Sequence, residues 1–136
     1  MAYLHVKELL ESLAQHADKR RFVYAIASPD ESGQSWCPGC RRVQPFVDEA
    51  RTKLPENAMW FDVHTGDRPT WRYPRNEFRM CSELSIQKVP TLLEFGTVSS
   101  PLFPSSLLVL LKDHRLTENE VTLSSILDMF NQTANT

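Results

Sequence analysis

Two cysteines stand three positions apart in the segment Trp36-Cys37-Pro38-Gly39-Cys40. Proline is favoured at the first position of a helix, so Pro38 places Cys37 at or just before a helix N-terminus. Free backbone N–H groups and the helix dipole stabilise negative charge there, which favours the Cys37 thiolate over the thiol. Because the thiolate is the nucleophile, Cys37 is the expected attacking group.

Cys40 lies one turn further along the same side of that helix, and this separation suits a disulfide without large backbone movement. The expected chemistry is thiol–disulfide exchange. Cys37 attacks a substrate disulfide to form a mixed disulfide, and Cys40 then attacks Cys37 and releases the reduced substrate. The protein is left with a redox-active Cys37–Cys40 disulfide and needs an external reductant. We expect no bound cofactor.

Two alternative roles for the cysteine pair have less support. A structural zinc site needs four ligands, but there is no second Cys-x-x-Cys pair and the histidines are scattered. If Cys37 and Cys40 were only a chance pair of buried thiols, they would not need to follow a strand and begin a helix, as is expected here. The third cysteine, Cys81, is expected to be a small apolar residue of the core or its rim, with a regulatory or resolving thiol as the alternative.

Composition narrows the class of protein. The 136 residues fit a single domain over 1–136, and 41% hydrophobic with 24% charged residues is typical of a soluble globular protein. The net charge of −2 argues against nucleic-acid binding. Charged residues near the N-terminus replace the apolar run of a signal peptide, and no apolar run approaches the about 20 residues that cross a bilayer. We expect a cytoplasmic monomer that binds neither nucleic acid nor membrane.

Hydrophobic patterns predict the elements that position the cysteine pair. The first three are an amphipathic helix over 4–17, a strand over 21–27 and a second buried strand over 58–64. The strand over 21–27 is apolar on both faces, as in the centre of a sheet that is covered on both sides. The polar loop 28–35 leads from this strand directly to the cysteines.

The remaining elements alternate between helix and strand. They are a helix over 38–53 kinked at Pro45, a loop over 65–75, a short helix over 76–84 capped by Asn76, a strand over 91–95 entered through Pro90, and a helix over 123–131. This order predicts an α/β fold in which a central mixed sheet is flanked by helices.

At this point the motifs resemble a known family. A Trp-Cys-x-x-Cys segment after a buried strand, a proline five residues past Cys40, and Val89-Pro90-Thr91 before a strand are similar to the thioredoxin superfamily. The loop 28–38 and the spaced Gly, Pro, Trp, Asn and Phe residues of 65–79 resemble, more closely, the cytosolic thioredoxin domain-containing protein 17 family. The resemblance covers roughly residues 22–97, which is far more specific than the cysteine pair alone.

The resemblance implies a thioredoxin fold and a cytosolic disulfide reductase. Such a protein reduces protein and small-molecule disulfides, is re-reduced by thioredoxin reductase with NADPH, and is linked to peroxidase activity. In the superfamily the proline that matches Pro90 is cis and packs beside the dithiol. The Val89 backbone would then offer hydrogen bonds to an extended substrate. Where the family usually has an acid, this chain has Gly39, which should favour the Cys37 thiolate further.

The expected substrate-binding surface consists of residues around the dithiol. They are Trp36, Pro38, Gly39, Val89, Pro90 and Trp71. Trp36 would shield the dithiol and shape a groove. Trp71, with Pro69, would form a rim that limits access, although a packing role in the loop accounts for Trp71 equally well.

Two features depart from the expected pattern. Ordinary thioredoxins keep a buried acid in the strand before the dithiol, and the strand over 21–27 has none. The base that assists Cys40 is therefore not identified, with Asp30 and Glu31 as weak candidates. The segment 98–114 has more residues than the hairpin of the family. An atypical insertion or an extended hairpin is therefore expected there.

Other functions are compatible with the fold. The main alternative is a thioredoxin-fold adaptor that binds partners without turnover, which would not need both cysteines. An oxidase or isomerase of an oxidising compartment is disfavoured because no signal peptide is recognisable.

Overall fold

The structure is a computed structural model that describes residues 2–96 and 115–132. Within this part of the chain, a four-stranded sheet has the order β2-β1-β3-β4. The strands are β1 (Arg20–Ile26), β2 (Ala58–His64), β3 (Thr91–Phe95) and β4 (Arg115–Thr117). β1 runs parallel to β2 and antiparallel to β3, and β3 is antiparallel to β4. This confirms the mixed sheet. The insertion expected over 98–114 lies outside the described residues.

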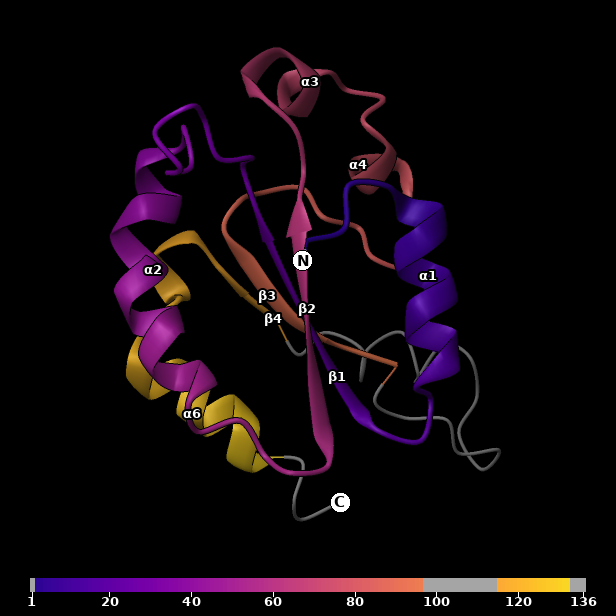
Figure 1. Ribbon diagram of the computed structural model, residues 1–136, viewed down its shortest axis with the longest axis vertical. Helices are drawn as coiled ribbons and strands as arrows, with labels where there is room; N and C mark the ends of the chain where they lie inside the picture. Colours follow the sequence, from indigo (N-terminus) through magenta and orange to yellow (C-terminus); the bar gives the residue numbers. More distant parts are fainter. Residues whose placement is uncertain (1, 97–114, 133–136) are drawn as a thin grey trace.

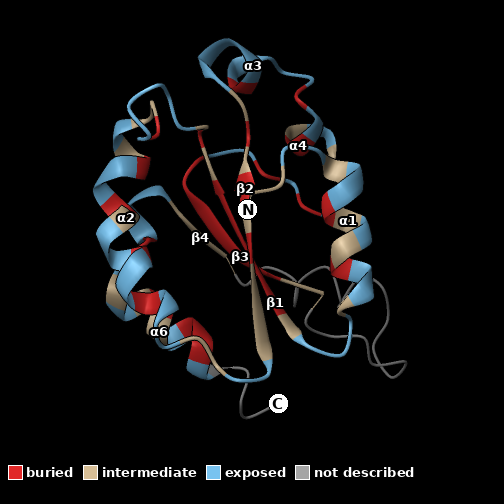
Figure 2. Ribbon diagram, viewed as in Figure 1, coloured by how far each residue is buried: buried red, intermediate tan, exposed pale blue. Residues whose placement is uncertain are grey.

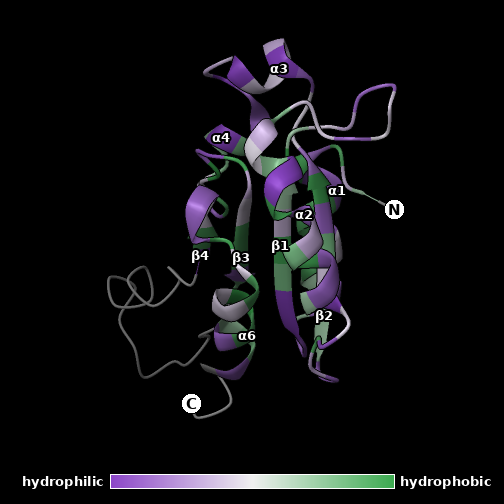
Figure 3. Ribbon diagram, turned by 90° about the vertical axis from the view of Figure 1, so that its left-hand side faces the viewer, coloured by the Kyte–Doolittle hydropathy of each residue, from purple (hydrophilic) through white to green (hydrophobic). Residues whose placement is uncertain are grey.

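Helices cover both faces of the sheet. α1 (Val6–Gln15) packs on one face, while α2 (Pro38–Arg51) and α6 (Leu123–Gln132) lie together on the other (Figure 1). Most residues of β1 and β3 are buried, and the helices expose their outer sides (Figure 2). Hydrophobic colour likewise follows the strands, whereas the short helices at one end of the molecule are largely hydrophilic (Figure 3).

The central strand β1 is apolar on both sides, as predicted. Phe22 and Tyr24 belong to the core between the sheet and α2 and α6. Val23 and Ala25 belong to the core on the α1 side. All four are almost completely buried. The strand can therefore hold the loop that follows it, and the cysteines at the end of that loop, in a fixed place.

β2 has the predicted bounds but is less buried than expected. Its only buried residues are Phe61 and Val63, because it lies at one edge of the described sheet. Part of this edge is covered by Tyr3, whose N–H donates to Asp62 O at 2.8 Å and whose carbonyl accepts from His64 N at 3.0 Å.

The segment 65–75, expected to be a loop, contains the short helix α3 (Arg68–Arg72). The Asp67 carboxylate caps this helix by accepting from Thr70 N at 3.0 Å. Pro69 lies in the first turn, where its missing N–H costs no helical hydrogen bond. The proline that suggested a loop is therefore compatible with a helix.

The next helix, α4 (Glu77–Met80), is capped by Asn76 as predicted but ends earlier than expected. Asn76 Oδ1 accepts from Phe78 N at 2.9 Å. The chain then leaves the helix at Cys81, so that Leu84 and Ile86 enter the core from an irregular segment. The sequence suggested a longer helix because Phe78, Cys81 and Leu84 are each three residues apart, as in a helical stripe.

Candidate active site

Cys37 is the N-cap residue of α2, and Pro38 occupies the first helical position. The predicted placement at a helix N-terminus is confirmed. Cys37 is half-buried, with its N–H donating to Ser35 Oγ at 3.2 Å and its carbonyl accepting from Arg41 N at 3.1 Å. Pro38 beside it is exposed. The attacking sulfur therefore lies at the molecular surface on a well-anchored backbone.

Cys40 lies one turn into α2 and is only 1% exposed. Burial raises the pKa of the Cys40 thiol to about 12, and Cys37 also acts to raise it. Hydrogen bonds from the Ala27 backbone and the Ser35 side chain act in the opposite direction. The two cysteines thus have different tasks available to them, since one is accessible and the other is protected and protonated at neutral pH.

The segment before β3 faces the cysteines. The Val89–Pro90 peptide bond is cis, as the resemblance implied. The Cys37 thiol points to the Val89 carbonyl oxygen at 3.9 Å. A Cβ atom at Gly39 would lie 3.7 Å from Pro90 Cδ and 3.8 Å from Cys37 Sγ. The structure therefore brings together Cys37, Gly39, Val89 and Pro90, although they come from two distant parts of the sequence.

Trp36 connects the dithiol to the segment before α3. Its Nε1 donates to Gly66 O at 3.0 Å, and the Arg68 guanidinium lies over its ring at 4.8 Å. The ring is partly buried. Trp36 thus lies next to Cys37, as expected for a side chain that shields the dithiol.

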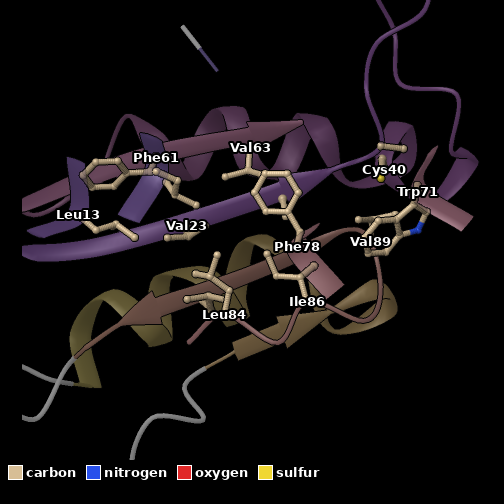
Figure 4. Packing of buried hydrophobic residues seen from close by; sticks show 14 residues of the cluster. Leu13, Val23, Cys40, Phe61, Val63, Trp71, Phe78, Leu84, Ile86 and Val89 are labelled. Carbon is tan, nitrogen blue, oxygen red and sulfur yellow. The ribbon is translucent and has the colours of Figure 1, made fainter. Parts of the chain in front are cut away.

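Trp71 is a core residue. It is 5% exposed and packs in the same cluster as Cys40 and Val89, at one end of that cluster (Figure 4). The Arg79 guanidinium covers its ring at 3.7 Å. A side chain this buried offers little surface to a substrate, so the structure favours a packing role for Trp71 over a rim. The neighbouring Pro69 is exposed.

Ser35 is a site residue that the sequence did not indicate. It is 7% exposed, its hydroxyl oxygen accepts from the N–H of Cys37 at 3.2 Å, and its side chain acts to lower the pKa of Cys40. Its carbonyl accepts from Arg41 Nη1 at 2.7 Å. A serine in a polar loop is usually solvated, so only the folded loop reveals this contact.

Asp30 and Glu31, the weak candidates for a base, are exposed. The Asp30 carboxylate accepts hydrogen bonds from the N–H and hydroxyl of Ser32, and these bonds lower its pKa. A carboxyl group with a lowered pKa is a poor proton acceptor at neutral pH. Asp30 therefore stabilises the loop rather than providing a base.

The remaining cysteine, Cys81, lies at the C-terminal end of α4 and is half-buried against the core. Its Sγ is 3.7 Å from Glu83 Oε1, and burial raises its pKa. In the part of the chain that the structure describes, no three His, Cys, Asp or Glu side chains are grouped as metal ligands would be. None of the helices described there is long and apolar enough to cross a bilayer.

Proteins similar to this chain point to one family. The family model for the thioredoxin domain of thioredoxin domain-containing protein 17-like proteins matches residues 2–133. Thioredoxin domain-containing protein 17 of Mus musculus is 31% identical over 95% of this chain and 91% of its own length. The protein of the same name from Homo sapiens is 36% identical over 67% of this chain and 72% of its own length. The chain belongs to the thioredoxin domain-containing protein 17-like family.

A plant relative agrees with this membership, and a solved structure agrees with the fold. Thioredoxin-like protein Clot of Arabidopsis thaliana is 36% identical over 63% of this chain and 65% of its own length. The crystal structure of chloroplastic thioredoxin z covers 100% of the chain and 97% of its own, with a TM-score of 0.56 and 14% identity. At this identity the likeness shows the thioredoxin fold alone, as predicted.

Proposed function

We propose that this protein is a thiol–disulfide oxidoreductase that reduces protein and small-molecule disulfides. The observation that carries the proposal is the pairing of a surface cysteine, Cys37, at the N-cap of α2 with a buried cysteine, Cys40, one turn later. A helix N-terminus stabilises the thiolate that attacks, and burial keeps the second thiol protected and protonated. Membership of a thioredoxin-like family supports the same chemistry.

The reaction has two exchanges. The Cys37 thiolate attacks one sulfur of a substrate disulfide, a Cys37–substrate bond forms, and the other substrate sulfur leaves as a thiolate. Cys40 then loses its proton and attacks Cys37 Sγ, which releases the second substrate thiolate. Two electrons pass to the substrate, and both leaving thiolates take protons from solvent. The protein ends as the Cys37–Cys40 disulfide.

The surface around Cys37 orients the substrate. Trp36, Pro38 and Gly39 form one side of it, and the Val89–Pro90 segment forms the other. An extended substrate chain would hydrogen-bond to the Val89 backbone. We further propose that thioredoxin reductase with NADPH restores the dithiol, that the protein acts in the cytoplasm, and that it supports a peroxidase by reducing disulfides formed during peroxide removal.

NADPH consumption tests this function. Wild type, thioredoxin reductase and cystine should give steady turnover, and Cys37→Ser should give none because the attacking sulfur is gone. Cys81→Ser is the matched control, since it removes a thiol outside the dithiol, and it should turn over like wild type. Absence of turnover in folded, reduced wild type would contradict the proposal and favour the adaptor function or a different electron donor.

A further inference from the structure

A cation lies beside the dithiol without a carboxylate partner among the described residues. Arg68, the first residue of α3, places its Cζ atom 4.8 Å from the centroid of the Trp36 ring, and Trp36 immediately precedes Cys37. Arg68 is exposed, and none of the ion pairs in the described part of the chain includes it. Its positive charge is therefore accessible to a substrate that approaches Cys37.

The position of Arg68 follows from the contacts of Trp36. The Gly66 carbonyl accepts from Trp36 Nε1 and from Ser28 N, each at 3.0 Å, and Gly66 N donates to Ser28 Oγ at 2.9 Å. This turn requires glycine, since φ of Gly66 is +120° and a Cβ atom there would lie 2.6 Å from Thr70 Cγ2. The same turn thus holds the indole and begins α3, which places the guanidinium over the ring face that cations prefer.

The acidic side chains near Arg68 and the dithiol have other partners. The carboxylate of the adjacent Asp67 accepts from the backbone of α3, at Thr70 N. The Asp30 carboxylate, in the loop 28–35, accepts from the N–H and hydroxyl of Ser32. Between the two cysteines the chain carries no acid, because residue 39 is glycine. The surface beside the attacking sulfur therefore combines an uncharged turn with a positive charge.

We propose that Arg68 is a specificity-determining residue of the disulfide exchange, and that its guanidinium favours disulfides flanked by a carboxylate. This inference rests on the proposed function and assigns it a substrate class. While the substrate sulfur meets Cys37 Sγ, a carboxylate next to the disulfide lies within the field of the guanidinium. Because both charges are exposed, the preference over an uncharged disulfide should be about fivefold.

The charge of Arg68 acts on the reaction in a second way. A positive charge beside Cys37 also favours its thiolate, whichever disulfide is attacked. This effect changes the rate constants for all disulfides by the same factor, since it alters only the ionised fraction of Cys37. Attraction of the substrate changes the rate constant for anionic disulfides alone. The ratio of two rate constants measured on one variant therefore isolates the effect of substrate charge.

DTNB and 4,4′-dithiodipyridine provide this ratio. DTNB carries a carboxylate on each ring, whereas 4,4′-dithiodipyridine is uncharged at neutral pH, and each releases an absorbing product when Cys37 attacks. Stopped-flow absorbance of the reduced protein gives the second-order rate constant of the first exchange with each reagent. Every protein in the series carries Cys81→Ser, so that only the dithiol reacts.

In Arg68→Gln, the ratio of the DTNB rate constant to the dithiodipyridine rate constant should fall about fivefold at low ionic strength. Arg68→Lys keeps the charge and should keep most of the preference. Lys53→Gln removes an exposed positive charge just past the other end of α2, about 20 Å along the helix from Cys37, and should match wild type.

Salt provides an independent test of the same charge effect. The Debye length shortens from about 30 Å at 0.01 M to about 3 Å at 1 M ionic strength, so the wild-type ratio should approach that of Arg68→Gln in high salt. A wild-type ratio that does not change with salt would contradict an electrostatic preference.

An unchanged ratio in Arg68→Gln, even if both rate constants fall together, would overturn the role of Arg68 in substrate choice and leave the proposed function intact. An equal loss in Lys53→Gln would assign the preference to net charge and would also overturn that role. Failure of the proposed function gives a different result. Folded, reduced protein would then release no second equivalent of TNB, because Cys40 would not resolve the mixed disulfide.

Discussion

At the residue scale, Cys37 and Cys40 share a helical turn but lie in opposite environments. Cys37 is half-buried at the N-cap, whereas Cys40 is covered and its pKa is raised to about 12. The sequence predicted the first placement, because Pro38 marks a helix start. It did not predict Ser35 as the hydrogen-bond partner of Cys37, because this contact depends on how the loop 28–35 folds.

Alkylation should distinguish the thiols. Iodoacetamide at neutral pH should modify Cys37 first and leave Cys40 unmodified, since Cys40 is buried and protonated there. Cys81, whose pKa is also raised, should react more slowly than Cys37. Labelling of Cys40 should increase as pH approaches the pKa of its thiol. Peptide mapping by mass spectrometry measures this, and equal early labelling of both active-site thiols would contradict the assignment.

Gly39 has room for a side chain, since its Cβ would be in ordinary contact with Pro90 and Cys37. Gly39→Asp places a carboxylate beside Cys37 and should disfavour its thiolate. The alkylation rate of Cys37 should fall by no more than about fivefold, because exposed charges interact by only about 1 kcal/mol. Gly39→Asn is the neutral control of the same size. An Asp variant that reacts as fast as the Asn variant would refute the charge effect.

At the element scale, Arg20 joins three parts of the fold at the start of β1. Its guanidinium pairs with the buried Glu94 of β3 at 2.9 Å and donates to the carbonyls of Met129 and Phe130 at the end of α6. The arginine thus ties the sheet to the helix that ends beside it.

Glu94→Ala should lower the free energy of unfolding by about 3 kcal/mol, because it leaves a largely buried arginine without its counter-charge. Lys88→Ala, which breaks the exposed pair of Lys88 with Glu118, should cost only about 0–1 kcal/mol. Denaturant titration measures both. A similar small loss in the two variants would show that the buried pair contributes no more than the exposed one.

The elements were predictable where pattern and tertiary packing agree. Strands 58–64 and 91–95 were predicted with the bounds that β2 and β3 have. α3 was missed because a Pro- and Gly-rich stretch resembles a loop, and only the Asp67 cap and the burial of Trp71 make it a helix. β4 has three residues, none of them buried, so no periodicity marks it.

At the scale of the whole molecule, residues far apart in sequence hold the N-terminal segment in place. The Glu77 carboxylate of α4 accepts from Val6 N at 2.6 Å and pairs with His5 Nδ1 at 3.1 Å. Tyr3 meanwhile pairs with the edge of β2. The start of α1 is therefore linked both to α4 and to the sheet.

The pair of His5 and Glu77 should make stability depend on pH. Its hydrogen bond and charge raise the pKa of His5 in the folded protein. A raised folded-state pKa adds stability below the unfolded pKa of about 6.5, and this stability is lost as pH rises through the folded value. His5→Asn should therefore be less stable than wild type in mild acid and equal to it in mild base. Urea midpoints across this range measure the difference, and a gap that widens with rising pH would contradict the pairing.

Trapping of a mixed disulfide tests whether this whole arrangement works as a disulfide reductase. Cys40→Ser, mixed with a disulfide substrate, should accumulate a covalent adduct on Cys37 that reductant releases, because the second exchange is blocked. Cys37→Ser should form none. The expected result is a substrate-sized mass increase mapped to Cys37 in the first variant alone. Absence of the adduct in folded Cys40→Ser, or an equal adduct in Cys37→Ser, would contradict the assignment of Cys37 as the attacking thiol.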